Sequence, residues 1–340
     1  MKMKNKINNT LKYFKENIVF FITLIVIIIA FNVNLPYSIY SPGGVINVGN
    51  RLEGEIYQSQ GNLNLTYVTF LEGKIPNLLL ALFLPEWDIV KNSDVTFEEE
   101  TLEELNLKDR IHLYESISNA TYLAYKKAGY NIEIANESIY IINTTDYADT
   151  NLKIGDKILS VDEKTIHNFD DLLNIINSHE INDKIKLNII RNSKELECYA
   201  VIKEDNFEKK IGIGISKINE YKLDPNIQYN YKNNESGASG GLMLSLALYN
   251  ALIEEDITKG KNISGTGTIS EDGTVGEISG VKYKLSGAVK NNSDIFIAPR
   301  ANYEEALKEK DKNNYKIDII VADTFDQVLE ELQKYSQSSH

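Results

Sequence analysis

The chain has 340 residues, of which 42% are hydrophobic and 25% are charged. These values exclude a disordered chain, and the length makes two compact domains the default expectation. Residues 1–16 carry five lysines and one glutamate, so the formal net charge of −13 leaves −17 on the rest of the chain. This acidity argues against nucleic acid as a partner.

The chemistry-bearing residues exclude several classes of site. Cys198 is the only cysteine, which rules out an intramolecular disulfide and a cysteine-based metal site. The four histidines are scattered and form no His-Glu-x-x-His motif, and no Gly-x-x-x-x-Gly-Lys-Ser/Thr motif is present. The sequence therefore predicts no metal, no cofactor and no ATPase.

The N-terminal region contains the longest uncharged apolar stretch, Ile18–Phe31. Because it follows a lysine-rich tail at 1–16, we predict a transmembrane anchor at 17–35 with the N-terminus in the cytoplasm. No Ala-x-Ala cleavage site follows it, which favours an anchor over a signal peptide, and its terminal position disfavours a buried core helix. The predicted location is the cell membrane, with the part of the chain after Pro36 outside the cytoplasm.

The region after the predicted anchor alternates in polarity over 51–75 and has helical character over 101–129, which predicts a strand followed by a helix. The segment Ile75–Val90 between them is apolar and contains Trp87. We assign this segment to the core; contact with a membrane face or a partner subunit is the alternative.

The middle of the chain is predicted to be a small β-rich module with strands at 138–143, 184–191 and 195–203 and a helix near 169–177. Its Leu-x-x-Gly-Asp-x-Ile-x-x-Val-Asp pattern at 152–162 resembles a PDZ domain, which implies peptide binding by β-augmentation. The groove residues would be Ile139, Tyr140 and Ile141. The preceding loop lacks the glycines that would bind a terminal carboxylate, so a scaffold or spacer role is the alternative.

The last third of the chain alternates helix and strand, which predicts an α/β arrangement. The segment 240–253 is apolar nearly all round, as in a buried helix. The segment 262–270 alternates strictly and places Thr266 on its polar face. It is followed by a turn signal at 271–273, buried strands at 295–298 and 316–321, and a capped helix that ends near Tyr335.

The loop before the predicted buried helix contains a possible nucleophile, Ser239, in the segment Ser236–Gly241. A Ser-His-Asp triad is excluded, since only His340 follows this serine. Free N–H groups at a helix start could stabilise an oxyanion, and we assign this role to the backbone of Gly237, Ala238, Ser239 and Gly240. The simpler alternative is that Ser239 only caps the helix.

An unprotonated lysine can activate a serine if burial lowers its pKa. The segment Gly280–Leu285 offers two lysines, Lys282 and Lys284, and the first follows Ser239 by 43 residues. A helical wheel places them on opposite flanks of the apolar stripe. By pattern alone, either lysine could be a solvated surface residue.

Three segments together resemble the proteolytic domain of Lon proteases: 236–241, the Gly-Thr-Gly at 265–267, and Gly276-x-x-x-Gly-Val-Lys-x-Lys at 276–284. The resemblance implies a Ser/Lys dyad, with Ser239 as nucleophile, Lys282 as general base and Thr266 as the threonine that hydrogen-bonds the lysine. Ala238 and Gly240 replace the proline and alanine usual in that family, and neither change removes a chemical group.

The whole chain is similar to membrane-anchored bacterial PDZ-Lon proteins. We therefore expect an α/β (α+β) Lon-type proteolytic domain with an inserted PDZ-like β-rich domain and one N-terminal transmembrane helix. The expected divisions are a basic tail at 1–16, an anchor at 17–35, Lon-like parts at 36–129 and 206–336, and the PDZ-like domain at 130–205. By analogy, Lon-like domains imply a homo-oligomer, a hexamer.

The predicted function is ATP-independent hydrolysis of peptide bonds in unfolded or extended proteins by a membrane-anchored serine endopeptidase. Two alternatives remain. One is a carboxyl-terminal processing protease, which also combines a PDZ domain with a Ser/Lys dyad, usually at shorter spacing. The other is a catalytically inactive, membrane-tethered binding or regulatory protein.

Overall fold

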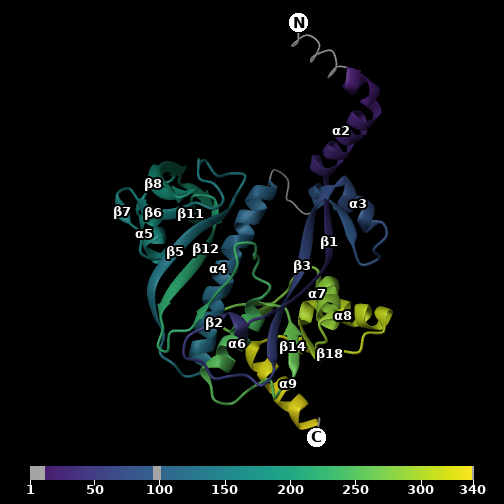
Figure 1. Ribbon diagram of the computed structural model, residues 1–340. Helices are drawn as coiled ribbons and strands as arrows, with labels where there is room; N and C mark the ends of the chain where they lie inside the picture. Colours follow the sequence, from purple (N-terminus) through teal and green to yellow (C-terminus); the bar gives the residue numbers. More distant parts are fainter. Residues whose placement is uncertain (1–11, 95–100, 339–340) are drawn as a thin grey trace, which may run out of the picture. The chain divides into compact units, whose positions relative to one another are not determined.

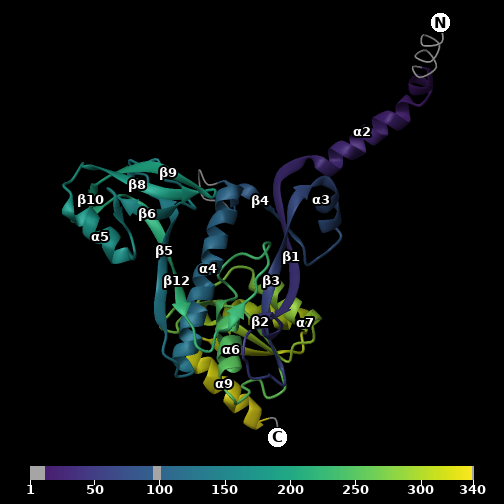
Figure 2. The same cartoon turned by 60° about the vertical axis from the view of Figure 1, so that its left-hand side comes forward.

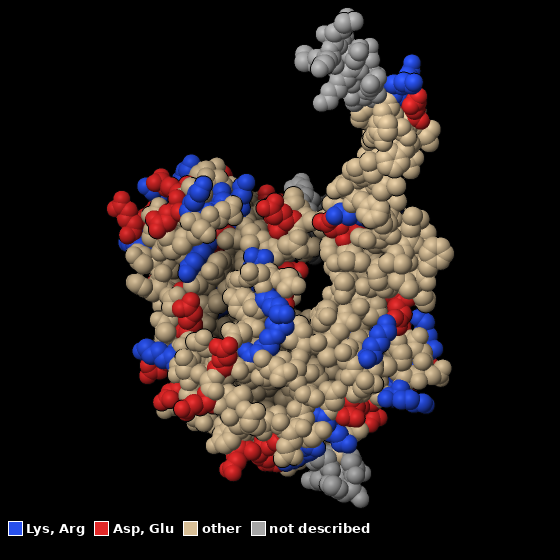
Figure 3. All heavy atoms as spheres, in the orientation of Figure 1, with Lys and Arg blue, Asp and Glu red and all other residues tan. Residues whose placement is uncertain are grey.

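The computed structural model describes residues 12–94 and 101–338 and divides into two compact units (Figures 1 and 2). The first unit is built from the described parts of 1–42 and 68–99, and the second from 43–67 and the described part of 100–340. Strands β1 (Asn34–Asn47) and β3 (Asn62–Lys74) contribute residues to both. Figure 3 shows charges of both signs interspersed, with no continuous basic area on the face drawn.

The first unit contains three further regular elements besides its parts of β1 and β3. They are helix α2 (Ile18–Asn32), helix α3 (Ile75–Ala81) and strand β4 (Asp88–Lys91), which is followed by the short helix η2 (Asn92–Asp94). Strand β4 pairs antiparallel with β1, with Tyr37 opposite Lys91 and Tyr40 opposite Asp88.

The predicted transmembrane span at 17–35 is contradicted. Within the described ranges, the model contains no helix that combines the length and the apolar character needed to cross a bilayer. Residues Ile18–Asn32 of the predicted span form α2, which has 15 residues.

The prediction that Ile75–Val90 belongs to the core is also wrong. Ala81 is the one buried residue of α3, whose seven residues are all described. Four large side chains in and just after α3 are 49–81% exposed: Leu79, Leu80, Leu82 and Phe83. The apolar composition of this segment therefore does not translate into burial within the chain.

The protease-like part of the second unit is an α/β arrangement around parallel strands. The start of β3 pairs with β14, which pairs with β17, which pairs with β18, all in parallel register. The elements of this part are η1 (Gly49–Arg51), β2 (Leu52–Glu53), α4 (Leu102–Lys127), β13 (Gln228–Tyr229), α6 (Gly241–Leu252), β14 (Asn262–Gly265), β15 (Thr268–Ile269), β16 (Val275–Gly276), α7 (Val281–Lys290), β17 (Ile295–Pro299), α8 (Arg300–Asn313), β18 (Asp318–Ala322) and α9 (Phe325–Ser338).

One hydrophobic core joins residues from both sides of the PDZ-like region. Leu63 and Leu123, from the first side, are buried in the same cluster as Leu246, Ile297 and Phe325 from the second. Helix α4 packs on the buried helix α6, and β2 pairs with β13. The segments before and after the PDZ-like region therefore fold together.

The PDZ-like region has its own sheet and its own core. Its sheet has the strand order β12-β5-β6-β8-β9, and β7 pairs with β6. The elements are β5 (Glu133–Thr144), β6 (Lys157–Val161), β7 (Lys164–Thr165), α5 (Phe169–Ser178), β8 (Lys184–Arg191), β9 (Lys194–Val201), the hairpin of β10 (Lys203–Asp205) and β11 (Glu208–Lys210), and β12 (Ile213–Lys222). Figures 1 and 2 show β12 alongside β5, with which it pairs antiparallel.

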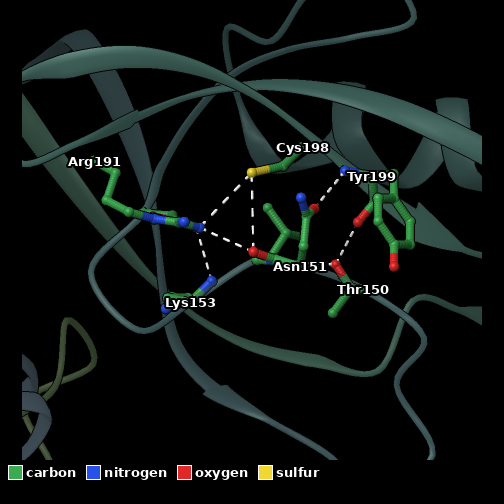
Figure 4. Close-up of polar contacts among 8 residues, drawn as sticks. Thr150, Asn151, Lys153, Arg191, Cys198 and Tyr199 are labelled. Carbon is green, nitrogen blue, oxygen red and sulfur yellow. Dashed lines mark hydrogen bonds and ion pairs between the residues drawn. The ribbon is translucent and has the colours of Figure 1, made fainter.

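An ion pair fixes the Gly-Asp turn that gave the PDZ-like pattern. The Asp156 carboxylate is fully buried and accepts hydrogen bonds from Nε of Arg191 at 2.7 Å, from its Nη2 at 2.6 Å and from the Lys153 N–H at 2.8 Å. Arg191 also donates to the Asn151 carbonyl at 3.0 Å, beside Cys198 (Figure 4). The turn before β6 is thereby tied to the end of β8.

We predict that Asp156→Ala destabilises the PDZ-like region by about 3 kcal/mol, because the variant leaves a partly buried guanidinium without its carboxylate. The measurement is the urea midpoint, together with amide hydrogen exchange of β6 and β8. Glu197→Ala is the control, since it removes one partner of the exposed Lys186–Glu197 pair and should cost less than about 1 kcal/mol. Equal effects of the two variants would contradict the role of the buried pair.

Candidate active site

Ser239 lies at the start of a buried helix, as its sequence context predicts. Gly240 is the N-cap of α6, and every residue of α6 except Tyr249 is buried. The first N–H groups of such a helix point out of its end and carry partial positive charge. The end of α6 can therefore stabilise a negative charge that develops beside Ser239.

The turn that carries Ser239 is held by hydrogen bonds on both of its sides. The Gly237 N–H donates to the Asp109 carbonyl at 2.8 Å, and the Ala238 carbonyl accepts from the Gly241 N–H at 3.1 Å. Gly237 has φ = +85°, which a glycine adopts without strain. Of the predicted oxyanion group, Gly237 therefore uses its N–H to hold the turn, so it is not a free donor.

Thr266 connects the nucleophile turn to the parallel sheet. Its hydroxyl donates to the Ser239 carbonyl at 3.0 Å, and the Gly267 N–H donates to the same carbonyl at 2.8 Å. The predicted strand over 262–270 is interrupted at this point, because β14 ends at Gly265 and β15 begins at Thr268. This break lets Thr266, which is fully buried, reach both Ser239 and the lysine described next.

Lys284 is the lysine that reaches Thr266. Its Nζ donates to the Thr266 Oγ1 at 3.1 Å, and the residue is only 4% exposed. Burial lowers the pKa of Lys284 from its usual 10.5 to about 7, because a charged ammonium loses its hydration there. A single hydroxyl, that of Thr266, thus connects the Lys284 side chain with the backbone of Ser239.

The predicted contact between Thr266 and Lys282 is wrong. Lys282 is partly exposed and lies over the ring of Tyr283, with 4.8 Å between its Nζ and the ring centroid. Gly280, with φ = +73°, precedes α7, and Lys282 falls in the first turn of this helix, on a different face from Lys284. The structure therefore does not place Lys282 in the position that the resemblance assigned to it.

A signal in the sequence could have identified Lys284. Val281, Leu285 and Ala288 are fully buried, and Lys284 occupies the i+3 position of the same i, i+3, i+4, i+7 stripe. A helical wheel that assigns every lysine to the surface leaves Lys284 out of the apolar stripe. If position 284 is counted as part of the stripe, the pattern predicts a buried lysine.

The predicted PDZ groove at Ile139, Tyr140 and Ile141 is also wrong. These residues lie in β5, which has β12 on one side and β6 on the other. Ile139 and Ile141 are 2% and 0% exposed and belong to the core of the module. A strand with neighbours on both sides cannot accept a further peptide strand.

Strand β12 is the edge strand on this side of the sheet, and α5 lies close to it. Nζ of Lys217, in β12, is 5.7 Å from the ring centroid of Phe169, at the start of α5. At the other end of α5, Lys209 donates to the carbonyls of Asn177 and His179. The edge of β12 and α5 are therefore neighbours.

The sequence carried a signal for this edge strand that lies beyond the predicted module boundary at 205. The segment Ile211–Ile215 alternates isoleucine and glycine, and Gly212 has φ = +71°. A Cβ at Gly212 would lie 2.7 Å from the Thr145 Oγ1, so the position requires glycine. The glycine-containing loop that β5 lacks is present before β12.

No metal-binding group is found over 12–94 and 101–338: these ranges contain no cluster of three His, Cys, Asp or Glu side chains that could hold an ion. Two histidines there pair with carboxylates. Nδ1 of His112 is 3.3 Å from Glu115, and Nε2 of His179 is 2.9 Å from Asp162.

Comparison with known families identifies two domains. Residues 232–334 match the Lon protease (S16) C-terminal proteolytic domain, and residues 123–200 match the PDZ domain. The chain thus combines a PDZ domain with a Lon-type proteolytic domain in a mixed α/β fold, a combination consistent with a PDZ-Lon serine protease. The predicted family resemblance is confirmed for these two domains.

Curated relatives are Lon proteases. The chain is 36% identical over 97 residues to the Lon protease of Campylobacter jejuni, covering 28% of this chain and 12% of that protein. It is 31% identical over 125 residues to the archaeal Lon protease of Thermoplasma acidophilum, covering 36% of this chain and 18% of that protein. The chain therefore spans less than a fifth of the length of these relatives.

Among solved structures, the PDZ domain of the SdrC-like protein from Listeria monocytogenes is 19% identical, with a TM-score of 0.23. The match covers 24% of this chain and 92% of the solved chain. A second match, GtR34C from Geobacillus thermodenitrificans, is also 19% identical, with a TM-score of 0.20. This match covers 21% of this chain and 84% of the solved chain.

We predict that Lys284→Met raises the unfolding free energy at pH 7 by about 2–4 kcal/mol. The folded protein binds fewer protons than the unfolded chain between pH 7 and 10.5, so the stability of the parent should rise with pH over this window. The variant should lack this rise. Chemical denaturation between pH 6 and 10 measures both effects.

Lys282→Met is the matched control. It removes a partly exposed lysine two residues away and should leave the rise of stability with pH in place. If Lys282→Met removes the pH dependence and Lys284→Met retains it, the buried lysine has been misidentified.

Proposed function

We propose that the chain is a serine endopeptidase that uses Ser239 as nucleophile and Lys284 as general base. The observation that carries this proposal is the connection from the Lys284 amine through the Thr266 hydroxyl to the Ser239 backbone. The Lon-type domain match supports the reaction class. Lys282, the base assigned from the resemblance, is replaced by Lys284 in this proposal.

In the proposed mechanism, neutral Lys284 accepts the proton of the Ser239 hydroxyl while Oγ attacks the peptide carbonyl carbon. The oxyanion of the tetrahedral intermediate is stabilised by N–H groups at the start of α6. Lys284 then gives its proton to the leaving amine, and an acyl-enzyme remains. A water molecule, deprotonated in turn by Lys284, attacks the ester carbonyl. The ester bond breaks, the acid product leaves, and Lys284 returns the proton to the Ser239 Oγ.

The lowered pKa of Lys284 makes this mechanism possible near neutral pH. A lysine with its usual pKa of about 10.4 would be neutral in fewer than about one molecule in a thousand at pH 7. With a pKa of about 7, roughly half of the Lys284 side chains are neutral at that pH. Thr266 accepts a hydrogen bond from the amine and so fixes its direction.

For the PDZ domain, we propose that an extended peptide adds to the edge of β12, beside α5. Ile213 and Ile215 of β12 and Phe169 of α5 are partly buried and pack against the module core, so their exposed parts offer apolar contacts. The N–H groups of the loop around Gly212 would bind a terminal carboxylate. Substrate presentation to the peptidase is the proposed use.

The finer parts of the function stay predictions. ATP independence is inferred from the absence of a phosphate-binding motif in the sequence. Unfolded or extended protein substrates, the hexamer and a location outside the cytoplasm follow from the resemblance.

We predict that the parent cleaves a fluorescent unfolded protein without ATP, and that kcat/KM rises with pH to a plateau with a midpoint near 7. The reason is that only the neutral amine of Lys284 can accept a proton. Ser239→Ala and Lys284→Ala should each lower kcat at least about a thousandfold.

Lys282→Ala is the control for this assay and should retain activity within about threefold. The reverse ranking of the two lysine variants would refute the assignment of the base. If the folded parent does not hydrolyse the fluorescent protein, the alternative of an inactive binding or regulatory protein is favoured.

We predict that a peptide with an apolar C-terminus, titrated into the Ser239→Ala chain, shifts the backbone amide resonances of β12 and α5 most. Gly212→Ala should weaken this binding about tenfold, because position 212 has a positive φ and no room for a Cβ. Gly260→Ala, at a positive φ with open space around it, is the control. If the amide resonances of 139–141 shift most instead, the assignment of the groove to β12 and α5 is contradicted.

A further inference from the structure

One face of helix α4 contacts the catalytic region at three places. The Asp109 carbonyl accepts from the Gly237 N–H, the Ser116 Oγ donates to the Ala238 carbonyl at 3.0 Å, and Asn119 Nδ2 donates to the Ile269 carbonyl at 3.1 Å. Their spacing of seven and three residues places them on one side of the helix. This face of α4 therefore holds the turn before Ser239 and the strand after Thr266.

We propose that Ser116 is a positioning residue that sets the orientation of the oxyanion donor; this inference rests on the proposed function. The Ala238–Ser239 peptide bond is trans, so its C=O and N–H point in opposite directions. Ser116 binds the carbonyl from the α4 side. The N–H of Ser239 is thereby directed away from α4, and Ser116 does not touch the substrate.

The surroundings of Ser116 keep this orientation fixed. Ser116 is 4% exposed, and a Cβ built on Gly241 would lie 2.5 Å from its hydroxyl oxygen and 2.8 Å from Cγ2 of Ile269. A glycine at 241 thus lets the start of α6 approach α4 closely. Rotating the Ala238–Ser239 peptide would break the bond from Ser116 as well as the 3.1 Å bond from the Gly241 N–H, so the Ser116 hydroxyl adds to the resistance against this rotation.

The experiment compares Ser116→Ala with the matched control Ser118→Ala. Ser118 is on the same helix, is 5% exposed and donates to a backbone carbonyl, that of Asn219, at 3.0 Å, outside the catalytic turn. Each variant loses one buried serine hydroxyl. The assays use the full chain and a short fluorogenic peptide, so that the PDZ domain does not enter the result.

For Ser116→Ala we expect kcat to fall at least tenfold and the affinity for a peptide boronate, which adds to the serine hydroxyl, to fall by a similar factor. KM and the pH midpoint near 7 should stay unchanged, since neither substrate contacts nor Lys284 are altered. The amide resonances of Ser239 and Gly240 should also shift. Ser118→Ala should match the parent in all of these readouts.

The inference is overturned if the two variants lose kcat equally, if Ser116→Ala raises KM and leaves kcat unchanged, or if the Ser239 amide resonance does not move. The amide resonances report the orientation of the peptide even in a chain without activity. An inactive parent, or a Ser239→Ala variant that stays active, would instead count against the proposed function.

Discussion

The site depends on one buried hydrogen bond, between the amine of Lys284 and the hydroxyl of Thr266. A lysine in this position is costly for folding, because its ammonium loses hydration and, among residues 12–94 and 101–338, gains no carboxylate partner that could hold its pKa up. The same loss of hydration makes the amine a base near neutral pH. The strand breaks at Thr266, between Gly265 and Gly267. This break brings together the backbone of Ser239, the hydroxyl of Thr266 and the amine of Lys284.

Helix α4 connects the parts of the chain that the PDZ domain separates. It packs on α6, contacts the turn before Ser239 and holds β12 through Ser118, so it touches both the peptidase core and the edge strand of the PDZ domain. Strand β12 leads back into the segment that carries Ser239. The insertion is therefore accommodated by a shared helix and one common core.

Local patterns predicted much of this architecture. The strand at 62–74, the helix at 102–127 and the buried helix after Ser239 follow from hydrophobic periodicity and from capping signals, which act over a few residues. The errors have different physical origins. The exposed segment Leu79–Phe83 shows that apolar composition alone does not say what covers a side chain. The misplaced groove arose because sheet order is set by pairing between distant strands, and β12 lies outside the predicted module boundary.

The sequence by itself determined the fold class, the serine, the threonine and a choice of two lysines, because motif spacing and periodicity encode backbone conformation and reactive groups. It did not determine which lysine is buried. In the structure, α7 places Lys284 within hydrogen-bond distance of the fully buried Thr266 and leaves Lys282 partly exposed. The apolar stripe of α7 includes position 284, but burial is a property of packed elements and burial sets the pKa of an amine. The tertiary structure therefore established the difference between two lysines that lie two residues apart.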